Sequence, residues 1–134
     1  MSVSPTEHPN AARMREVAES VARGDIANAL QHFPDDVVWF TPAGGGGEGV
    51  YRGRDGLGRF FGRLADRSNG TMRPDVDEVL GSDDHVVIFL HITARRADDE
   101  LDVTVAHFAT AAPSGFTRNW FLPDDVVAWN RFFG

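Results

Sequence analysis

The chain of 134 residues has no cysteine, which excludes disulfides, thiol nucleophiles and cysteine-bound metals. Lysine is also absent, since all 13 basic residues are arginines. A Schiff base and the lysine of a phosphate-binding P-loop are therefore excluded as well. Any catalytic or binding site must be built from histidine, carboxylate, hydroxyl, amide and aromatic side chains.

Positive charge and long apolar runs are also scarce. The net charge is −7 at pH 7, and such a surface repels a phosphate backbone, so we expect no nucleic-acid partner. No apolar run approaches the roughly 20 residues that a membrane span needs, so we expect no membrane partner. Residues 1–16 lack the apolar core of a signal peptide, and the expected location is the cytoplasm.

The pattern of apolar residues predicts one domain, residues 1–134, with helices in its first half and strands in its second. Helical spacing predicts helices over residues 11–23 and 54–67, the latter capped by Asp55, and a short helix that starts from a cap at Asp25. The first strand is expected within residues 35–40. Four alternating segments then predict an antiparallel meander with strands in residues 71–83, 85–96, 101–111 and 115–122. A short helix is expected within residues 123–134. This order predicts an α+β fold.

The stretch "TPAGGGGEGVYRG" contains Gly44, Gly46 and Gly49, which have the G-x-G-x-x-G spacing of a dinucleotide-binding loop. Such a loop must join a strand to a helix, because the phosphate sits on the helix N-terminus. Here the predicted helix begins only near Asp55, and the rest of the chain is a meander without βαβ units. We therefore interpret the glycine stretch as a flexible loop at the mouth of the domain that can act as a lid.

His107 is the main candidate for chemistry. In residues 101–111 the odd-numbered positions are apolar apart from His107, so this face should look inward and carry the imidazole with it. A buried imidazole needs a hydrogen-bond partner or a water molecule. Two interpretations remain open: a structural core histidine, or a general acid/base that gives and accepts a proton near pH 7.

Other side chains are candidates for binding. His91 lies on a strand with two apolar faces, and it belongs either to a pocket or to a dimer face. No ligand spacing supports a metal site between His91 and His107, so we expect neither a metal nor another cofactor. Trp39 and Thr41 share one side of the strand before the glycine loop, where a pocket mouth is expected. Tyr51, the only tyrosine, either contacts a ligand or fixes the loop.

The order of these elements resembles the SnoaL-like branch of the nuclear-transport-factor-two-like superfamily. The resemblance lies in "ARGDIANALQHFPDDVVWFTP", "YRGRDGLGRFFGRL" and the meander that closes on "NWFLPDD". It implies a cystatin-like cone, in which a curved antiparallel sheet wraps around N-terminal helices and encloses an apolar pocket. It also implies a homodimer through the sheet. Members of this superfamily include ketosteroid isomerases, polyketide cyclases, scytalone dehydratase and binding proteins with no chemistry.

The resemblance also assigns roles to positions. The three catalytic positions of ketosteroid isomerases correspond to Val17, Thr41 and His107, so the steroid mechanism is not expected here. SnoaL-type cyclases pair a histidine on the penultimate strand with an aspartate on the last strand. His107 matches that histidine, and the last strand offers Trp120, Phe121 and Leu122 at the place of the aspartate.

The expected pocket is therefore apolar and aromatic, with a few polar points. Its aromatic lining is expected to be Trp39, Phe61 and Trp120, with Phe121 as a further candidate, and its polar points to be Thr41, Tyr51, His91 and His107. Such a lining suits a flat hydrophobic ligand with one or two oxygens. We expect a cofactor-independent cyclase, isomerase or dehydratase of a polyketide- or terpenoid-like substrate, with His107 as the acid/base. The alternatives are a binding protein without chemistry and an interaction module that works through the sheet face.

Overall fold

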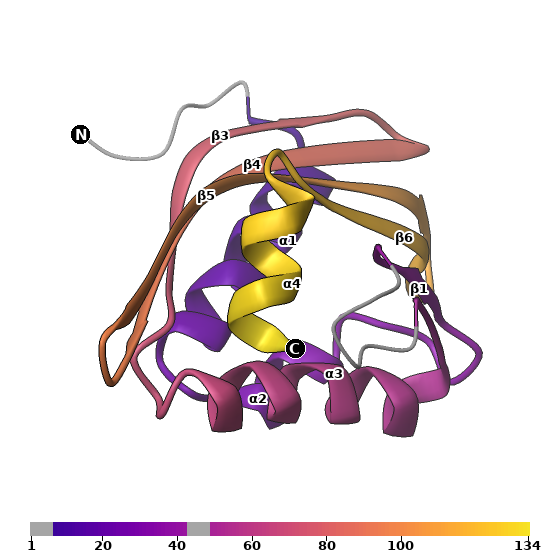
Figure 1. Ribbon diagram of the computed structural model, residues 1–134. Helices are drawn as coiled ribbons and strands as arrows, with labels where there is room; N and C mark the ends of the chain where they lie inside the picture. The colour runs from indigo at the N-terminus through magenta and orange to yellow at the C-terminus, as the bar shows by residue number, and fades with distance from the viewer. Residues whose placement is uncertain (1–6, 43–48) are drawn as a thin grey trace.

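A curved sheet arches over the helices (Figure 1). The computed structural model describes residues 7–42 and 49–134. Its strands are β1 (Val38–Phe40), β2 (Val50–Arg52), β3 (Arg73–Gly81), β4 (His85–Arg96), β5 (Asp99–Ala112) and β6 (Gly115–Pro123), and its helices are α1 (Pro9–Ala22), α2 (Ile26–Leu30), α3 (Gly53–Arg67) and α4 (Val126–Phe133). The strands lie in the order β2-β1-β6-β5-β4-β3. In the described ranges, none of the helices has the length and hydropathy needed to cross a bilayer.

The sheet is built mainly from the antiparallel meander that the alternating segments predict, β3 to β6. β1 extends it by pairing parallel with β6, which places Trp39 beside Asn119. β2 pairs antiparallel with β1 at the sheet edge, with Tyr51 opposite Trp39. The sequence pattern assigns residues 50–52 to the glycine loop, because three residues are too few to show alternation. The predicted α+β class and the curved sheet wrapped around helices are confirmed.

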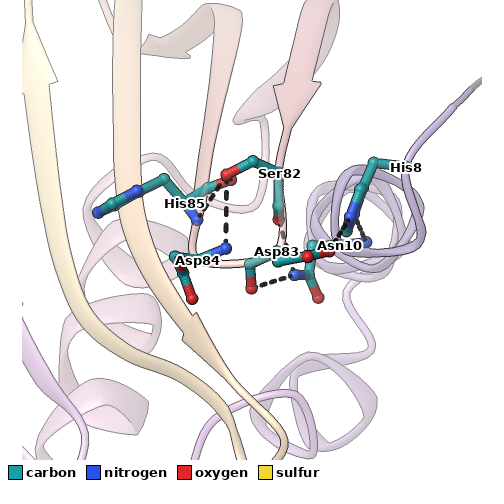
Figure 2. A network of polar contacts seen from close by, with 6 residues as sticks. All are labelled: His8, Asn10, Ser82, Asp83, Asp84 and His85. Carbon is teal, nitrogen blue, oxygen red and sulfur yellow. Dashed lines mark hydrogen bonds and ion pairs between the residues drawn. The ribbon is translucent and has the colours of Figure 1, made fainter.

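The first turn of α1 is tied to the hairpin between β3 and β4 (Figure 2). His8 caps the helix, since its Nδ1 accepts from the backbone N–H of Asn10 at 3.0 Å, and its Nε2 lies 2.8 Å from Oδ1 of Asp83. The Asn10 side chain donates to the backbone carbonyls of Ser82 (2.9 Å) and Asp83 (3.2 Å). These contacts hold the buried face of α1 against the concave side of the sheet.

The two later helices, α3 (Gly53–Arg67) and α4 (Val126–Phe133), also lie on the concave side of the sheet (Figure 1). α3 begins at Gly53, one residue earlier than predicted, and Gly53 has a φ of 75°. Asp55 therefore lies in the first turn of the helix and is not its cap. Its carboxylate still lies near the positive end of the helix dipole. α4 is capped by Asp125, whose side chain accepts from the backbone N–H of Ala128 at 2.9 Å. The glycine stretch proposed as a lid, residues 43–48, lies outside the described residues.

Candidate functional site

An apolar cavity lies between α1, α3 and the concave face of the sheet. Its volume is about 30 Å³, which is room for about two water molecules. Its wall is made by fourteen side chains: Met14, Val17, Ala18, Val21, Trp39, Phe61, Leu64, Met72, Pro74, Ile88, Leu90, Ile92, His107 and Phe121. His107 is the only ionisable residue among them, so any acid/base chemistry in this cavity must involve its imidazole.

His107 lies on the inner face of β5, as the alternation of that strand predicts. It is 3% exposed and faces Phe121 of β6 in the strand register. Its Nε2 lies 2.8 Å from Oδ1 of Asn119, two residues before Phe121 on the same strand. The predicted inward orientation of the imidazole is therefore confirmed, and the hydrogen-bond partner that a buried imidazole requires is an amide.

The surroundings of Asn119 fix the tautomer of His107. The Nδ2 amino group of Asn119 donates to the backbone carbonyl of Phe116 at 3.1 Å and to that of Val38 at 3.4 Å. Because both carbonyls can only accept, the amide must turn its Oδ1 toward the imidazole. Nε2 of His107 then carries the hydrogen and donates it, which leaves Nδ1 as the acceptor nitrogen of a neutral ring.

Burial is the dominant electrostatic influence on His107. Removal of the ring from water lowers its pKa to about 4, although the hydrogen bond to Asn119 partly opposes that shift. The imidazole is therefore neutral at pH 7. A neutral imidazole whose proton is held at Nε2 can accept a further proton only at Nδ1.

Trp39 provides a second polar group beside His107. Its ring centroid lies 4.6 Å from that of His107, and the residue is 1% exposed. The indole Nε1–H is buried and has no hydrogen-bond partner among the described residues. A buried indole N–H usually has a partner, and leaving such a donor unpaired costs about 1–3 kcal/mol. Two residues of an otherwise apolar cavity wall thus carry nitrogen atoms: His107, and Trp39 with its unpaired indole N–H.

The remaining predicted pocket residues divide into those whose side chains lie inside the arch of the sheet and those on its outer face. Phe61 lines the cavity with Trp39, as expected. Thr41 and Tyr51 instead line a separate cavity of about 20 Å³ next to α4, and only Leu64 belongs to both cavities. The hydroxyl of Thr41 is buried without a partner among the described residues. These two residues therefore do not share a chamber with His107.

Trp120 and His91 point away from the cavity, which corrects the expected lining. Trp120 stacks on Phe40 on the outer face, with ring centroids 5.5 Å apart. The cause is a β-bulge on β6. Thr110 pairs with Arg118 and Ala111 with Phe116, so no residue of β5 lies opposite Thr117 in the register, and the alternation of β6 changes phase. Phe121 consequently takes the inner position that the unbroken alternation assigns to Trp120.

The side chain of His91 is 43% exposed and its Nε2 lies 2.6 Å from Oδ1 of Asp102. That carboxylate raises the pKa of His91. His91 faces outward because its neighbours Leu90 and Ile92 point into the core. Of the two alternatives for His91, the pocket residue is wrong, and a place in a dimer face stays a prediction.

Sequence reasoning missed Asn119, which is fully buried and holds His107. The available signal was its position two residues from Phe121, which puts the two side chains on one face of a strand. Within residues 7–42 and 49–134, no three histidine or carboxylate side chains are arranged to hold a metal ion.

Comparison with known proteins identifies the fold family. A family model described as a SnoaL-like domain matches residues 14–115. The chain belongs to the family of SnoaL-like domains. An uncharacterised protein of Mycobacterium tuberculosis is similar to this SnoaL-like domain, with 33% identity over 121 residues that cover 90% of this chain and 92% of that protein.

Solved structures share the fold. A Xanthomonas campestris protein with a cystatin-like fold matches with a TM-score of 0.86 at 20% identity, covering 95% of this chain and 99% of that one. The structure of TerC co-crystallised with polyporic acid matches with a TM-score of 0.81 at 23% identity, covering 94% and 98%. The predicted cystatin-like architecture is confirmed.

Proposed function

We propose that this SnoaL-like domain binds a small, largely apolar molecule with one or two oxygens and acts on it without a cofactor, with His107 as acid and base. The reaction class is cyclisation, isomerisation or dehydration of a polyketide- or terpenoid-like substrate. The observation that carries the proposal is the buried, neutral His107–Asn119 pair beside the unpaired indole N–H of Trp39 on an apolar wall.

The chemistry that suits this pair is removal of a proton next to a carbonyl. Nδ1 of His107 takes a proton from the carbon beside the carbonyl, and the electrons of that C–H bond form an enolate. The indole N–H of Trp39 donates to the enolate oxygen, where the negative charge develops. The imidazolium then returns its proton to another carbon of the ligand in an isomerisation, or to a departing hydroxide in a dehydration. In a cyclisation the enolate carbon forms a bond to a second carbonyl carbon of the ligand, and the proton goes to the alkoxide oxygen that this leaves. Asn119 is a positioning residue, because it keeps the second ring nitrogen protonated throughout.

The low pKa of His107 in the free protein is compatible with this role. A pKa of about 4 makes the empty site a weak base, because an isolated imidazolium is poorly solvated inside the cavity. An enolate formed beside the ring compensates for that lost solvation, since opposite charges attract strongly in a medium of low dielectric constant. Proton transfer is therefore favoured only when a ligand occupies the cavity.

A binding protein without chemistry is the second candidate. It is favoured by the amide partner of His107, because the resemblance implies an aspartate on the last strand as the partner of this histidine. Asn119 cannot take a proton or stabilise an imidazolium as a carboxylate does. The TerC co-crystal with polyporic acid supports a small-molecule ligand for both candidates. The two differ in whether a bound molecule exchanges a proton with His107.

Exchange of α-hydrogens for deuterium in acetophenone tests the proposal. We expect the protein in D₂O to accelerate exchange, and His107→Gln to slow it about 100-fold, because Gln keeps a donor for Asn119 but cannot act as the base. NMR spectra of the ketone measure the rate. His91→Gln is the matched control, because His91 lies on the outer face, and its rate should stay within a factor of two. Binding of the ketone without accelerated exchange would support the binding protein and contradict the enzyme.

We also propose that the protein is a homodimer through the outer face of the sheet. That face carries a continuous row of rings, in which Phe40 contacts Trp120 at 5.5 Å, Trp120 contacts Phe108 at 5.7 Å, and Phe108 contacts His85 at 5.7 Å. Phe108 is 40% exposed, and nearby Leu122 is 49% exposed. An exposed aromatic row of this kind is typical of a protein interface.

The charges on either side of this aromatic row favour a second copy as the partner. Arg52 and Arg118 are both opposite Val38 and therefore lie on the outer face near one sheet edge. Asp75 lies opposite His91 near the other edge, and Asp102 contacts the same imidazole. Arg118 lies in the same row of the sheet as His85, six residues along β4 from His91. A two-fold axis in the plane of the interface and oblique to the strands would therefore place the arginines of one copy over the aspartates of the other.

Trp120→Arg is expected to convert the dimer into a monomer, because it puts a charge in the middle of the aromatic row. Sedimentation velocity at a protein concentration near 50 µM measures the change. Val127→Arg is the control, since Val127 is exposed on α4, outside the sheet face, and should leave the dimer intact. A wild-type monomer, or a dimer that persists in Trp120→Arg, would contradict the proposed interface.

A further inference from the structure

An open groove lies where the end of α1, the start of α2, the end of α3 and the segment before β3 meet. Its volume is about 240 Å³. It is lined by Val21, Ala22, Arg23, Gly24, Ile26, Phe61, Ala65, Ser68, Gly70 and Met72. The lining is mostly aliphatic, with Arg23 and Ser68 as its polar side chains.

Three side chains separate this groove from the inner cavity. Val21, Phe61 and Met72 line both spaces, so each contacts the cavity on one side and the groove on the other. These three side chains form a single layer between the two spaces, here called the partition. His107 and Trp39 line only the cavity side, whereas Ala22 and Ala65 line only the groove side.

The backbone around the partition is held by hydrogen bonds, whereas the partition itself can move. Asn28 of α2 donates to Ser20 of α1 at 2.7 Å and to Glu16 at 2.8 Å, which fixes the corner between the two helices. Thr71, next to Met72, donates to the backbone carbonyl of Ser68 at 2.6 Å. Met72 is unbranched and has three flexible side-chain torsions. The cavity and the groove can therefore join through side-chain rotation, without a backbone rearrangement.

The cavity alone is too small for the ligand that the chemistry requires. Its 30 Å³ is about one tenth of the roughly 300 Å³ at which ligand pockets begin. The groove supplies most of the missing volume. A molecule that places its oxygen beside Trp39 and His107 must therefore extend past the partition.

We propose that the cavity and the groove are two halves of one site, and that the ligand is an elongated molecule with an apolar tail. Its oxygen-bearing end lies at His107 and Trp39, and its tail passes Val21, Phe61 and Met72 into the groove. The tail is aliphatic and uncharged, in keeping with the aliphatic lining. This inference rests on the proposed function, because it assumes that the reacting end of the ligand lies at His107.

Two ketones with the same head test the inference: acetophenone, and octanophenone, which adds six methylene groups to form an aliphatic tail. Affinities are measured from the indole N–H resonance of Trp39 in ¹⁵N-labelled protein, assigned with Trp39→Phe. We expect octanophenone to bind at least 10-fold more tightly than acetophenone, because its tail is buried in the groove. Ala65→Trp and Ala22→Trp, which fill the groove from two exposed positions, should weaken octanophenone at least 10-fold and weaken acetophenone less, because acetophenone lacks the tail that occupies most of the groove.

Ala27→Trp is the matched control, because Ala27 is exposed on α2 and is not part of the groove lining. It should bind both ketones as the wild type does. If both groove variants bind octanophenone as tightly as the wild type while the Trp39 signal still shifts, the groove assignment is overturned and the proposed function stands. If neither ketone shifts that signal in the wild type or in Met72→Ala, which thins the partition, both the groove and the proposed function are overturned.

Discussion

Acidification from pH 7 to pH 4 is expected to lower the free energy of unfolding by about 3 kcal/mol through His107 alone. The pKa of this imidazole is about 4 in the folded protein, against about 6.5 in the unfolded chain. Between these values the unfolded state binds more protons than the folded state, so protons favour unfolding. The contribution of His107 is complete above pH 6.5 and is lost as the pH falls toward 4.

Urea unfolding of the wild type and of His107→Gln at a series of pH values measures this effect. Carboxylates also titrate in this range, so the informative quantity is the difference between the two proteins at each pH. The wild type should lose about 3 kcal/mol more than His107→Gln between pH 7 and pH 4. All measurements need one protein concentration, because a dimer unfolds in a concentration-dependent way. Parallel pH dependences of the two proteins would show that His107 is not a buried neutral group.

Gly115→Ala is expected to destabilise the fold by about 3–5 kcal/mol. Gly115 is the first residue of β6 and has a φ of 125°, a backbone angle that residues other than glycine rarely adopt. A Cβ at this position would overlap the carbonyl oxygen of His32 and lie 2.9 Å from its carbonyl carbon. That carbonyl also accepts from the backbone N–H of Phe116 at 3.0 Å, so it cannot withdraw without breaking a hydrogen bond. Urea unfolding followed by tryptophan fluorescence measures the loss.

Gly62→Ala is the matched control. Gly62 lies in α3, is exposed, and has open space where a Cβ would be added. Alanine there should stabilise the protein by about 0.5–1 kcal/mol, because glycine is the poorer helix former. If Gly115→Ala unfolds at the same urea concentration as the wild type, the backbone at the start of β6 can relax, and the contact between β6 and the segment around His32 is not rigid.

The sequence predicted most of the fold because the long elements have clear periods. The alternation of residues 101–111 placed His107 on the inner face, and the four meander strands lie where their patterns put them. Short elements were not visible, since β2 has only three residues between the glycine stretch and α3. The parallel pairing of β1 with β6 is a contact between distant segments, and no local pattern reports it.

The candidate site was only partly predictable, and the errors have a physical cause. The β-bulge at Thr117 changes the phase of β6 and exchanges the faces expected for Trp120 and Phe121. Asn119 comes to lie within hydrogen-bond distance of His107 for the same reason. The separation of Tyr51 and Thr41 from His107 depends on how Leu64 and the neighbouring rings pack, which a sequence pattern does not specify.

The imidazole nitrogen resonances of His107 at pH 7, with and without octanophenone, give the most direct test. We expect a neutral ring with its proton on Nε2 and an unprotonated Nδ1 in the free protein, and a change in the Nδ1 resonance when the ketone binds. A pH titration of the same resonances should give a pKa of about 4. A doubly protonated ring at pH 7, or a ketone that binds without any change at Nδ1, would contradict the assignment of His107 as the base in this cavity.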